Sequence, residues 1–358
     1  MLANADRSLA ATLRALAAER GIAVRAFAGG WVHRLSRGET VRDVVGYAFP
    51  LNSATAHAVA QDKSAAAEVL EASGVACVPH RLVLRPELGG YVGAAGNWAA
   101  LLEWFHAWNA DVVIKPNEGT GGEGVVRARS VAELEAAVHG GLAAHRALAV
   151  SPFVPLAMEA RAVVLRGEVL LAYAKRRPAI TGDGVRTLGA LAHEAGLARV
   201  AGLARVASGG PDAREVVPAG VTRLVDWRHN LGLGAAPEPL APDAREAVGA
   251  VALRAARALG LAFCSIDVAR PLAGGAAAGG AAPEAGAEGA ASGDLLVMEA
   301  NAGVMVEHYA RLAPDGPATA RRLYGRALDA LFPPPSGGAA SGDPPAPQPA
   351  PESPPLPR

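Results

Sequence analysis

The sequence contains only two cysteines, Cys77 and Cys264, in 358 residues. Two cysteines cannot build a disulfide framework or a cysteine-based zinc site, and both lie in apolar runs where a thiol packs as a small hydrophobic group. No apolar run reaches the length that spans a membrane. The N-terminus has charges at Asp6 and Arg7 and lacks the apolar core of a signal peptide. We therefore expect a soluble, cytoplasmic protein with no membrane partner.

The chain also has no net charge and few aromatic residues. Lys and Arg number 34 and Asp and Glu number 34, which leaves no net charge, and no long basic run occurs. Proteins that bind nucleic acid carry basic patches, so we expect no nucleic-acid partner. Aromatic residues make up 4% of the chain, and the hydrophobic fraction of 51% depends mainly on alanine. The length is enough for roughly two domains with buried cores.

Two stretches have the composition of disordered chain. Residues 271–293 are rich in Gly, Ala and Glu, and residues 333–358 are rich in Pro, Gly and Ser. Such segments hold too little apolar surface to offset the entropy of ordering them. We predict that 271–293 is a disordered hairpin loop between two strands and that 333–358 is a disordered tail.

The most informative stretch is DVVIKPNEGTGGEGVV, residues 111–126. A β-branched run leads to Lys115, a glycine-rich loop follows, and a second β-branched pair comes next. A strand, a lysine and a glycine loop can lay an ammonium and backbone N–H groups over phosphates. A flexible surface turn is the alternative, and the lysine at the strand end favours the phosphate site. The loop glycines are Gly119, Gly121, Gly122 and Gly124.

Three common glycine motifs do not fit this stretch. The spacing satisfies G-x-G-x-x-G, but the dinucleotide fingerprint needs a helix that opens at the glycines. Here the next helix begins later, at a capping box formed by Ser130 and Glu133. No Lys-Ser or Lys-Thr follows the glycines, which excludes a Walker A loop, and no H-R-D or D-F-G follows, which argues against a protein kinase. The loop is therefore predicted to be a hairpin tip.

Charged residues gather on a second predicted hairpin. Glu159 and Arg161 lie near the start of its first strand, and Lys175 and Arg177 lie at the end of its second. Cations at a strand end can guard an exposed edge or bind an anion. The sequence alone leaves both alternatives open.

Polar residues also interrupt the last two apolar strands. Asp267 lies in LAFCSIDVAR, and Glu299 and Asn301 end LLVMEAN. Glu299 and Asn301 are two residues apart, so their side chains share one face of a strand, and such groups are costly to bury without a partner. Two carboxylates and an amide oxygen suit Mg²⁺ on nucleotide phosphates. A strand end that reaches solvent is the alternative.

Five segments in a fixed order resemble those of ATP-grasp ligases. They are Asp62-Lys63, VVIKPNEGTGGEGV, SPFVPLAMEAR, KRRPAITGDG, and Asp267 followed by MEAN. The GDG and RHNLGLGA segments resemble cyanophycin synthetase and the ATP-grasp part of bifunctional glutathione synthetases, and MEANAGVM resembles the ribosomal-protein glutamate ligases. The resemblance covers about residues 50–330, nearly all of the chain that we expect to be ordered.

This resemblance implies a role for each candidate residue. Phosphate contacts are implied for Lys63, Lys115 and a lid made of Gly119, Gly121, Gly122 and Gly124. Adenine is implied to bind the backbone near Ser151, Phe153 and Val154, because the usual acidic hinge residue is absent there, and Glu159 is implied to bind the ribose. Mg²⁺, or alternatively Mn²⁺, is implied at Asp267, Glu299 and Asn301. Catalytic cations facing a phosphoryl group or carboxylate are implied at Arg161, Lys175 and Arg177, with His229 and Asn230 as weaker candidates.

The resemblance also implies an α+β protein with the ATP-grasp fold, in which two α/β subdomains clasp ATP. Residues 1–60 are then a partial N-terminal α/β segment, shorter than the domain that usually helps to hold the acceptor. Residues 61–332 form the ATP-grasp domain, with a lid subdomain at about 111–155. A homodimer or homotetramer is common in this family.

The implied reaction is ATP-dependent ligation of a carboxylate to an amine, on an amino acid or short peptide. The carboxylate attacks the γ-phosphate of Mg-ATP to give an acyl phosphate, and the amine then displaces phosphate and leaves an amide. The protein positions the reactants and neutralises charge, and no Ser-His-Asp or Cys-His arrangement stands out. The alternatives are an ATP-grasp small-molecule kinase and a non-catalytic nucleotide-binding module.

Overall fold

The computed structural model describes residues 8–88, 90, 96–119, 121–197, 212–272 and 295–333. Apart from positions 271, 272 and 333, the predicted insert 271–293 and tail 333–358 lie outside the described residues. No helix within the described residues is both long and apolar enough to cross a membrane. Helices combine with antiparallel sheets, which confirms the α+β class predicted from the sequence.

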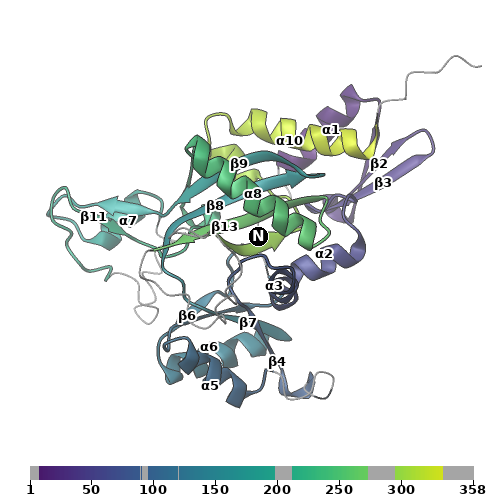
Figure 1. Ribbon diagram of the computed structural model, residues 1–358. Coiled ribbons are helices and arrows are strands. Elements are labelled where there is room, and N and C mark those ends of the chain that lie inside the picture. The colour runs from purple at the N-terminus through teal and green to yellow at the C-terminus, as the bar shows by residue number, and fades with distance from the viewer. Residues whose placement is uncertain are drawn as a thin grey trace, which may run out of the picture.

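The centre of the molecule is an antiparallel sheet with the strand order β12–β9–β8–β13–β14, the large sheet (Figure 1). The pairing of β8 with β9 confirms the second predicted hairpin. The pairing of β13 with β14 shows that the strands before and after the 271–293 insert are neighbours, as predicted. The strands are β8 (Leu156–Leu165), β9 (Glu168–Arg176), β12 (Ala236–Glu238), β13 (Phe263–Pro271) and β14 (Leu296–Asn301).

Each face of the large sheet carries its own hydrophobic core, because side chains alternate along a strand. Val163 and Phe263 on one face pack with helices α1, α9 and α10. Ala162 and Ile266 on the other face pack with α2, α3 and α8. The helices are α8 (Pro242–Ala258), α9 (Glu307–Leu312) and α10 (Gly316–Leu331), together with the N-terminal helices given below.

The N-terminal elements pack onto the first of these faces. Leu9, Leu35 and Val44 belong to the same buried cluster as Phe263. Glu307 is 2% exposed and accepts hydrogen bonds from the backbone N–H groups of Ser8 (3.1 Å) and Leu9 (2.9 Å), where a carboxylate suits a helix N-terminus. The elements are α1 (Ser8–Glu19), β1 (Ala23–Phe27), the 3₁₀ turn η2 (Ala28–Gly30), β2 (Val32–Arg37), β3 (Thr40–Val45), α2 (Ala54–Gln61) and α3 (Lys63–Ala72).

A second antiparallel sheet, the glycine-loop sheet, has the order β4–β7–β5–β6 and lies below the large sheet in Figure 1. Ile114 and Val150 pack under its helices, so Val113, Lys115 and Ser151 face the opposite way. The antiparallel pairing of β5 with β6 confirms the hairpin predicted around the glycine loop. Its elements are β4 (Arg81–Leu84), η3 (Pro86–Leu88), α5 (Trp98–Ala107), β5 (Val112–Pro116), β6 (Val126–Ala128), α6 (Val131–Ala144) and β7 (Ala147–Pro152).

Helix α3 lies between the two sheets (Figure 1) and begins at Lys63, directly after its capping residue Asp62. The Asp62 carboxylate accepts a hydrogen bond from the N–H of Ala65 (2.8 Å). Ser53 caps α2 and Ser130 caps α6 through hydrogen bonds of the same kind. Each such cap stabilises a helix by about 1 kcal/mol, and here the cap at Asp62 also sets the position of Lys63, the next residue.

A small lobe extends to one side of the large sheet, at the left of Figure 1. Its strands β10 and β11 pair antiparallel and pack with α7 around Leu188 and Val217. The chain leaves the lobe through residues 226–230 and returns to the space between the two sheets. The lobe comprises β10 (Ala179–Thr181), α7 (Leu188–Glu194) and β11 (Thr222–Leu224), and the 3₁₀ turn η5 (Leu231–Leu233) follows it.

Candidate active site

The structure brings the three predicted metal-ligating residues onto one face of the large sheet. Asp267 on β13 lies directly opposite Glu299 on β14, and Ser265 lies directly opposite Asn301. The Ser265 hydroxyl and the Asn301 amide nitrogen are both buried without a hydrogen-bond partner in the described residues. Because buried polar groups are nearly always hydrogen-bonded, this pair points to a polar group that the protein itself does not supply.

Asp267 is the centre of a buried ion network that links three strands. It is 4% exposed and accepts two hydrogen bonds from Arg161 on β8, both 2.7 Å long, while the Lys175 ammonium on β9 lies 2.8 Å away. Burial acts to raise the pKa of Asp267, but Arg161 and Lys175 together hold it well below its usual range. Asp267 is therefore ionised, and only part of its acceptor capacity is left for another ligand.

Glu159 lies beside this network. Its Oε1 accepts a hydrogen bond from Lys175 (2.6 Å), and its Oε2 lies 3.5 Å from Nδ1 of His229. Burial raises the pKa of Glu159 against the opposing effect of Lys175, and burial lowers the pKa of His229 to about 4. The carboxylate predicted to bind a ribose thus has one oxygen engaged by Lys175, and His229 stays neutral.

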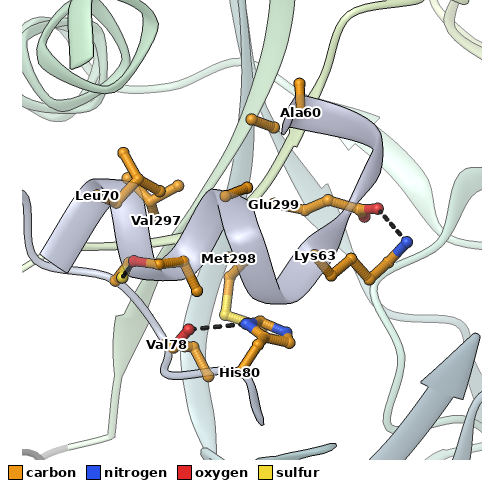
Figure 2. Close-up of a pocket in the computed structure, with 12 residues that line it drawn as sticks. Ala60, Lys63, Leu70, Val78, His80, Val297, Met298 and Glu299 are labelled. Carbon is orange, nitrogen blue, oxygen red and sulfur yellow. Dashed lines mark hydrogen bonds and ion pairs between the residues drawn. The ribbon is translucent and has the colours of Figure 1, made fainter. Parts of the chain in front are cut away.

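Lys63 connects the glycine loop with Glu299. Its ammonium donates to the carbonyl of Gly119 (2.6 Å) and lies 3.2 Å from a Glu299 carboxylate oxygen, the ion pair that Figure 2 shows at the end of α3. Asn117, which is 1% exposed, ties the start of α3 to the end of β5 by accepting from the backbone N–H of Ser64 (3.2 Å). The loop, the helix and the carboxylate therefore meet at one place.

Lys115 has no hydrogen bond and no ion pair with any other described residue, although it is half-buried. Burial lowers its pKa to about 8, the charge of Lys63 acts in the same direction, and the charges of Glu299 and Glu159 oppose the shift. A cation held out of water without a partner is costly. Its side chain faces away from the helices of its own sheet, so Lys115 is a candidate anion-binding group.

Arg177, the third predicted catalytic cation, also has no ion pair with another described residue. Its charge contributes to the low pKa of His229, so the guanidinium lies near that ring. Arg161 and Lys175 differ from it, because both already contact Asp267.

The segment predicted to contact adenine joins the two sheets. Ser151 is buried on β7 opposite Val113. The N–H of Phe153 is already engaged by the carbonyl of Asp111 (2.9 Å), and its ring packs edge-on against Trp227 with centroids 5.4 Å apart. The N–H of Val154 makes no hydrogen bond with another described residue. Of the backbone groups predicted here, the one at Val154 is therefore open to a ligand.

Asn230 holds the glycine loop from the other side. Its amide donates to the carbonyl of Gly121 (2.9 Å), while its side-chain oxygen accepts from the N–H of Gly232 (2.8 Å) and fixes the amide orientation. A Cβ atom at Gly122 would lie 2.8 Å from the Asn230 amide nitrogen, so only glycine allows this approach. The resemblance implied only a weak catalytic role for Asn230. It implied no role for Asn117, which stands two residues after Lys115 in the sequence.

The predicted donor set suits Mg²⁺, which prefers carboxylate and amide oxygens. Glu299 is partly exposed, Asn301 brings a side-chain oxygen on the same strand face, and Asp267 keeps part of its acceptor capacity. In the described residues, no cluster of three or more His, Cys, Asp or Glu side chains could hold a metal ion. The candidate site therefore depends on the amide of Asn301 and on oxygens brought by a ligand.

No protein-family model matches this sequence, and no curated protein sequence does. Solved structures do match. A bifunctional glutathione synthetase from Pasteurella multocida is 16% identical, with a TM-score of 0.47 over 88% of this chain. A D-alanine–D-alanine ligase from Bacillus anthracis is 14% identical, with a TM-score of 0.45 over 78% of this chain and 68% of its own. The ATP-grasp ligase PsnB, complexed with minimal precursor, is 16% identical, with a TM-score of 0.40 over 77% of this chain and 63% of its own.

The chain resembles ATP-grasp ligases. It spans 44% of the length of the glutathione synthetase that it matches.

Proposed function

We propose that this protein is an ATP-dependent carboxylate–amine ligase that acts on an amino acid or short peptide. The observation that carries this proposal is the unpartnered ammonium of Lys115. The charges of Lys63 and Glu299 act on it, Asn301 shares the strand face of Glu299, and Lys63 contacts both Glu299 and the glycine loop. A cation without a counterion, beside metal-suited oxygens and a glycine loop, fits a polyphosphate bound with a divalent cation.

The residues that bind the nucleotide come from both sheets. Lys63 and Lys115 neutralise the phosphates, and the loop from Gly119 to Gly124 covers them with backbone N–H groups. The open N–H of Val154 binds the base at the segment that joins the sheets. Glu299 and Asn301, with the remaining lone pair of Asp267, hold Mg²⁺. The metal supplies charge neutralisation to the phosphates during transfer.

The acceptor carboxylate binds at the cationic end of the large sheet. Arg177 has no partner of its own in the described residues and is free to pair with that carboxylate. Arg161 and Lys175 contribute positive charge from their fixed positions around Asp267. Bringing the carboxylate to the terminal phosphate lets it form an acyl phosphate, and an amine bound beside it then forms the amide. No enzyme nucleophile is needed, because the protein acts by positioning and by charge.

A phosphate-release screen over pairs of amino acids and dipeptides with Mg-ATP tests this proposal. We expect release that requires both a carboxylate and an amine, and mass analysis should find a product equal to their sum minus one water. The variant Glu299→Ala should be inactive. Glu238→Ala is the matched control, because Glu238 pairs with Arg176 on the exposed edge of the large sheet, and it should keep the activity.

The products also separate the alternatives. A product heavier by one phosphoryl group, with no amide, identifies a small-molecule kinase. ATP bound without turnover across the whole panel identifies a nucleotide-binding module. ATP consumption that survives Glu299→Ala unchanged contradicts the assignment of the metal site.

A further inference from the structure

Ser265 is a buried polar residue to which the proposed reaction gives no role. It lies on β13 two residues before Asp267, so the two side chains share one face of the large sheet. Its neighbour on one side is Val163 of β8, and its neighbour on the other side is Asn301 of β14. Ser265 is 1% exposed, and its hydroxyl has no hydrogen-bond partner in the described residues. Of its two cross-strand neighbours, only Asn301 offers it a polar side chain.

The two ends of the Asn301 amide are in different surroundings. Its nitrogen is buried and has no hydrogen-bond partner in the described residues. Its oxygen also makes no hydrogen bond with another described residue, but that atom keeps contact with solvent. The nitrogen end is therefore turned into the protein, and the oxygen end is open to a ligand.

The two ends of an amide have nearly the same shape but opposite chemistry. The oxygen accepts hydrogen bonds and can ligate a hard cation such as Mg²⁺, whereas the NH₂ group only donates. An amide that ligates a metal therefore gains from a neighbour that holds its nitrogen end, as metal ligands in general are oriented by hydrogen bonds to nearby groups. A serine hydroxyl can accept such a bond. Residues directly opposite in antiparallel strands have Cβ atoms about 4.5–5.5 Å apart, a span that one water molecule or a rotated hydroxyl closes.

We propose that Ser265 is a positioning residue for the metal site. Its hydroxyl accepts a hydrogen bond from Nδ2 of Asn301, through one water molecule or, after rotation of the hydroxyl, directly, and so keeps Oδ1 of Asn301 turned toward Mg²⁺. The inference rests on the proposed function, in which Glu299 and Asn301 hold the metal, and it gives Ser265 no contact with the metal or the substrates. It also accounts for two polar groups buried opposite each other, an arrangement that is costly unless they are hydrogen-bonded.

Calorimetric titration with ATP, in Mg²⁺ and in EDTA, tests the proposal and does not require the acceptor substrate. Ser265→Ala removes the acceptor and lets the Asn301 amide turn. The gain in ATP affinity that Mg²⁺ gives should fall about tenfold, the effect of losing a group that orients a metal ligand, while ATP binding in EDTA should stay within about twofold of the wild type. Ser36→Ala is the matched control, because Ser36 is a half-buried strand residue in the separate sheet β1–β2–β3, and it should keep the full gain.

A double variant separates the orientation of the amide from a general effect on the fold. Asn301→Asp puts an oxygen at both ends of the side chain, so its orientation no longer matters to the metal. In that background Ser265→Ala should change the gain that Mg²⁺ gives by less than about twofold. A loss of equal size in both backgrounds overturns the proposal, because Ser265 would then act on the site without the amide.

The metal-free wild type provides a second measurement. With isotopically labelled asparagine, the side-chain amide protons of Asn301 should exchange slowly with solvent, because the nitrogen end is buried and hydrogen-bonded; Asn301→Asp, which lacks the signal, identifies it. Rapid exchange overturns the role of Ser265. A gain from Mg²⁺ that Glu299→Gln abolishes and Ser265→Ala leaves unchanged also refutes only that role. If Mg²⁺ gives the wild type no gain in ATP affinity, the proposed metal site itself is refuted, which is a distinct result.

Discussion

Replacing Arg161 with leucine should destabilise the protein strongly, because Arg161 is the bidentate partner of a buried carboxylate. Both of its hydrogen bonds to Asp267 are 2.7 Å long, and the Asp267 side chain is 5% exposed. Breaking a buried ion pair from one side costs about 3–5 kcal/mol. Lys175 remains 2.8 Å from Asp267 and compensates in part, so we expect the lower end, about 3 kcal/mol.

Urea unfolding of Arg161→Leu measures this cost, and the double variant Arg161→Leu/Asp267→Leu supplies the comparison. Removing both charges replaces the pair with apolar groups, so the double variant should be more stable than the single one. The pKa of Asp267 is lowered in the folded protein, so the stabilisation is present above its unfolded pKa of about 3.9 and is lost as pH falls. The gap between wild type and Arg161→Leu should therefore narrow below about pH 4. A single-variant cost below about 1 kcal/mol, or a double variant no more stable than the single one, would refute this reasoning.

The other predictions concern the candidate nucleotide site. The pKa of Lys115 is lowered to about 8, so nucleotide affinity should fall as pH rises through 8, and binding above that pH should take up a proton. Calorimetry in buffers of different ionisation enthalpy detects this proton uptake. Proton uptake that persists in Lys115→Met would contradict the assignment of Lys115 to the phosphates. Asn230→Ala removes the hydrogen bond to Gly121 and should weaken ATP binding about fivefold while speeding hydrogen exchange in the glycine loop; unchanged exchange would show that Asn230 does not hold the loop. Glu299→Gln should abolish the gain in ATP affinity that Mg²⁺ gives, and a normal gain would place the metal elsewhere.

Local sequence patterns predicted the elements that position the site. The β-branched runs on either side of the glycine loop predicted the β5–β6 hairpin, and the capping box of Ser130 and Glu133 predicted the start of the next helix, α6. The spacing of Glu299 and Asn301 predicted that both side chains lie on one face of β14. In the structure they lie opposite Asp267 and Ser265 of β13. These features depend on the alternation of side chains along a strand and on helix capping, and short stretches of sequence encode both.

Long-range partners could not be predicted in the same way. The sequence suggested Asp267 as a metal ligand but not as a partner of Arg161 and Lys175. These contacts arise because β8 is the neighbour of β13 in the sheet and β9 is the next strand beyond β8. The contact of Asn230 with Gly121 joins residues 109 positions apart. Such features follow from packing, which no single segment specifies.

A crystal structure with Mg²⁺ and a non-hydrolysable ATP analogue tests the central claim most directly. The account predicts that the terminal phosphates lie against Lys115 and Lys63 beneath the glycine loop, with the metal bound by Glu299 and Asn301. A nucleotide bound away from these residues, or phosphates that leave Lys115 without a partner, would contradict it.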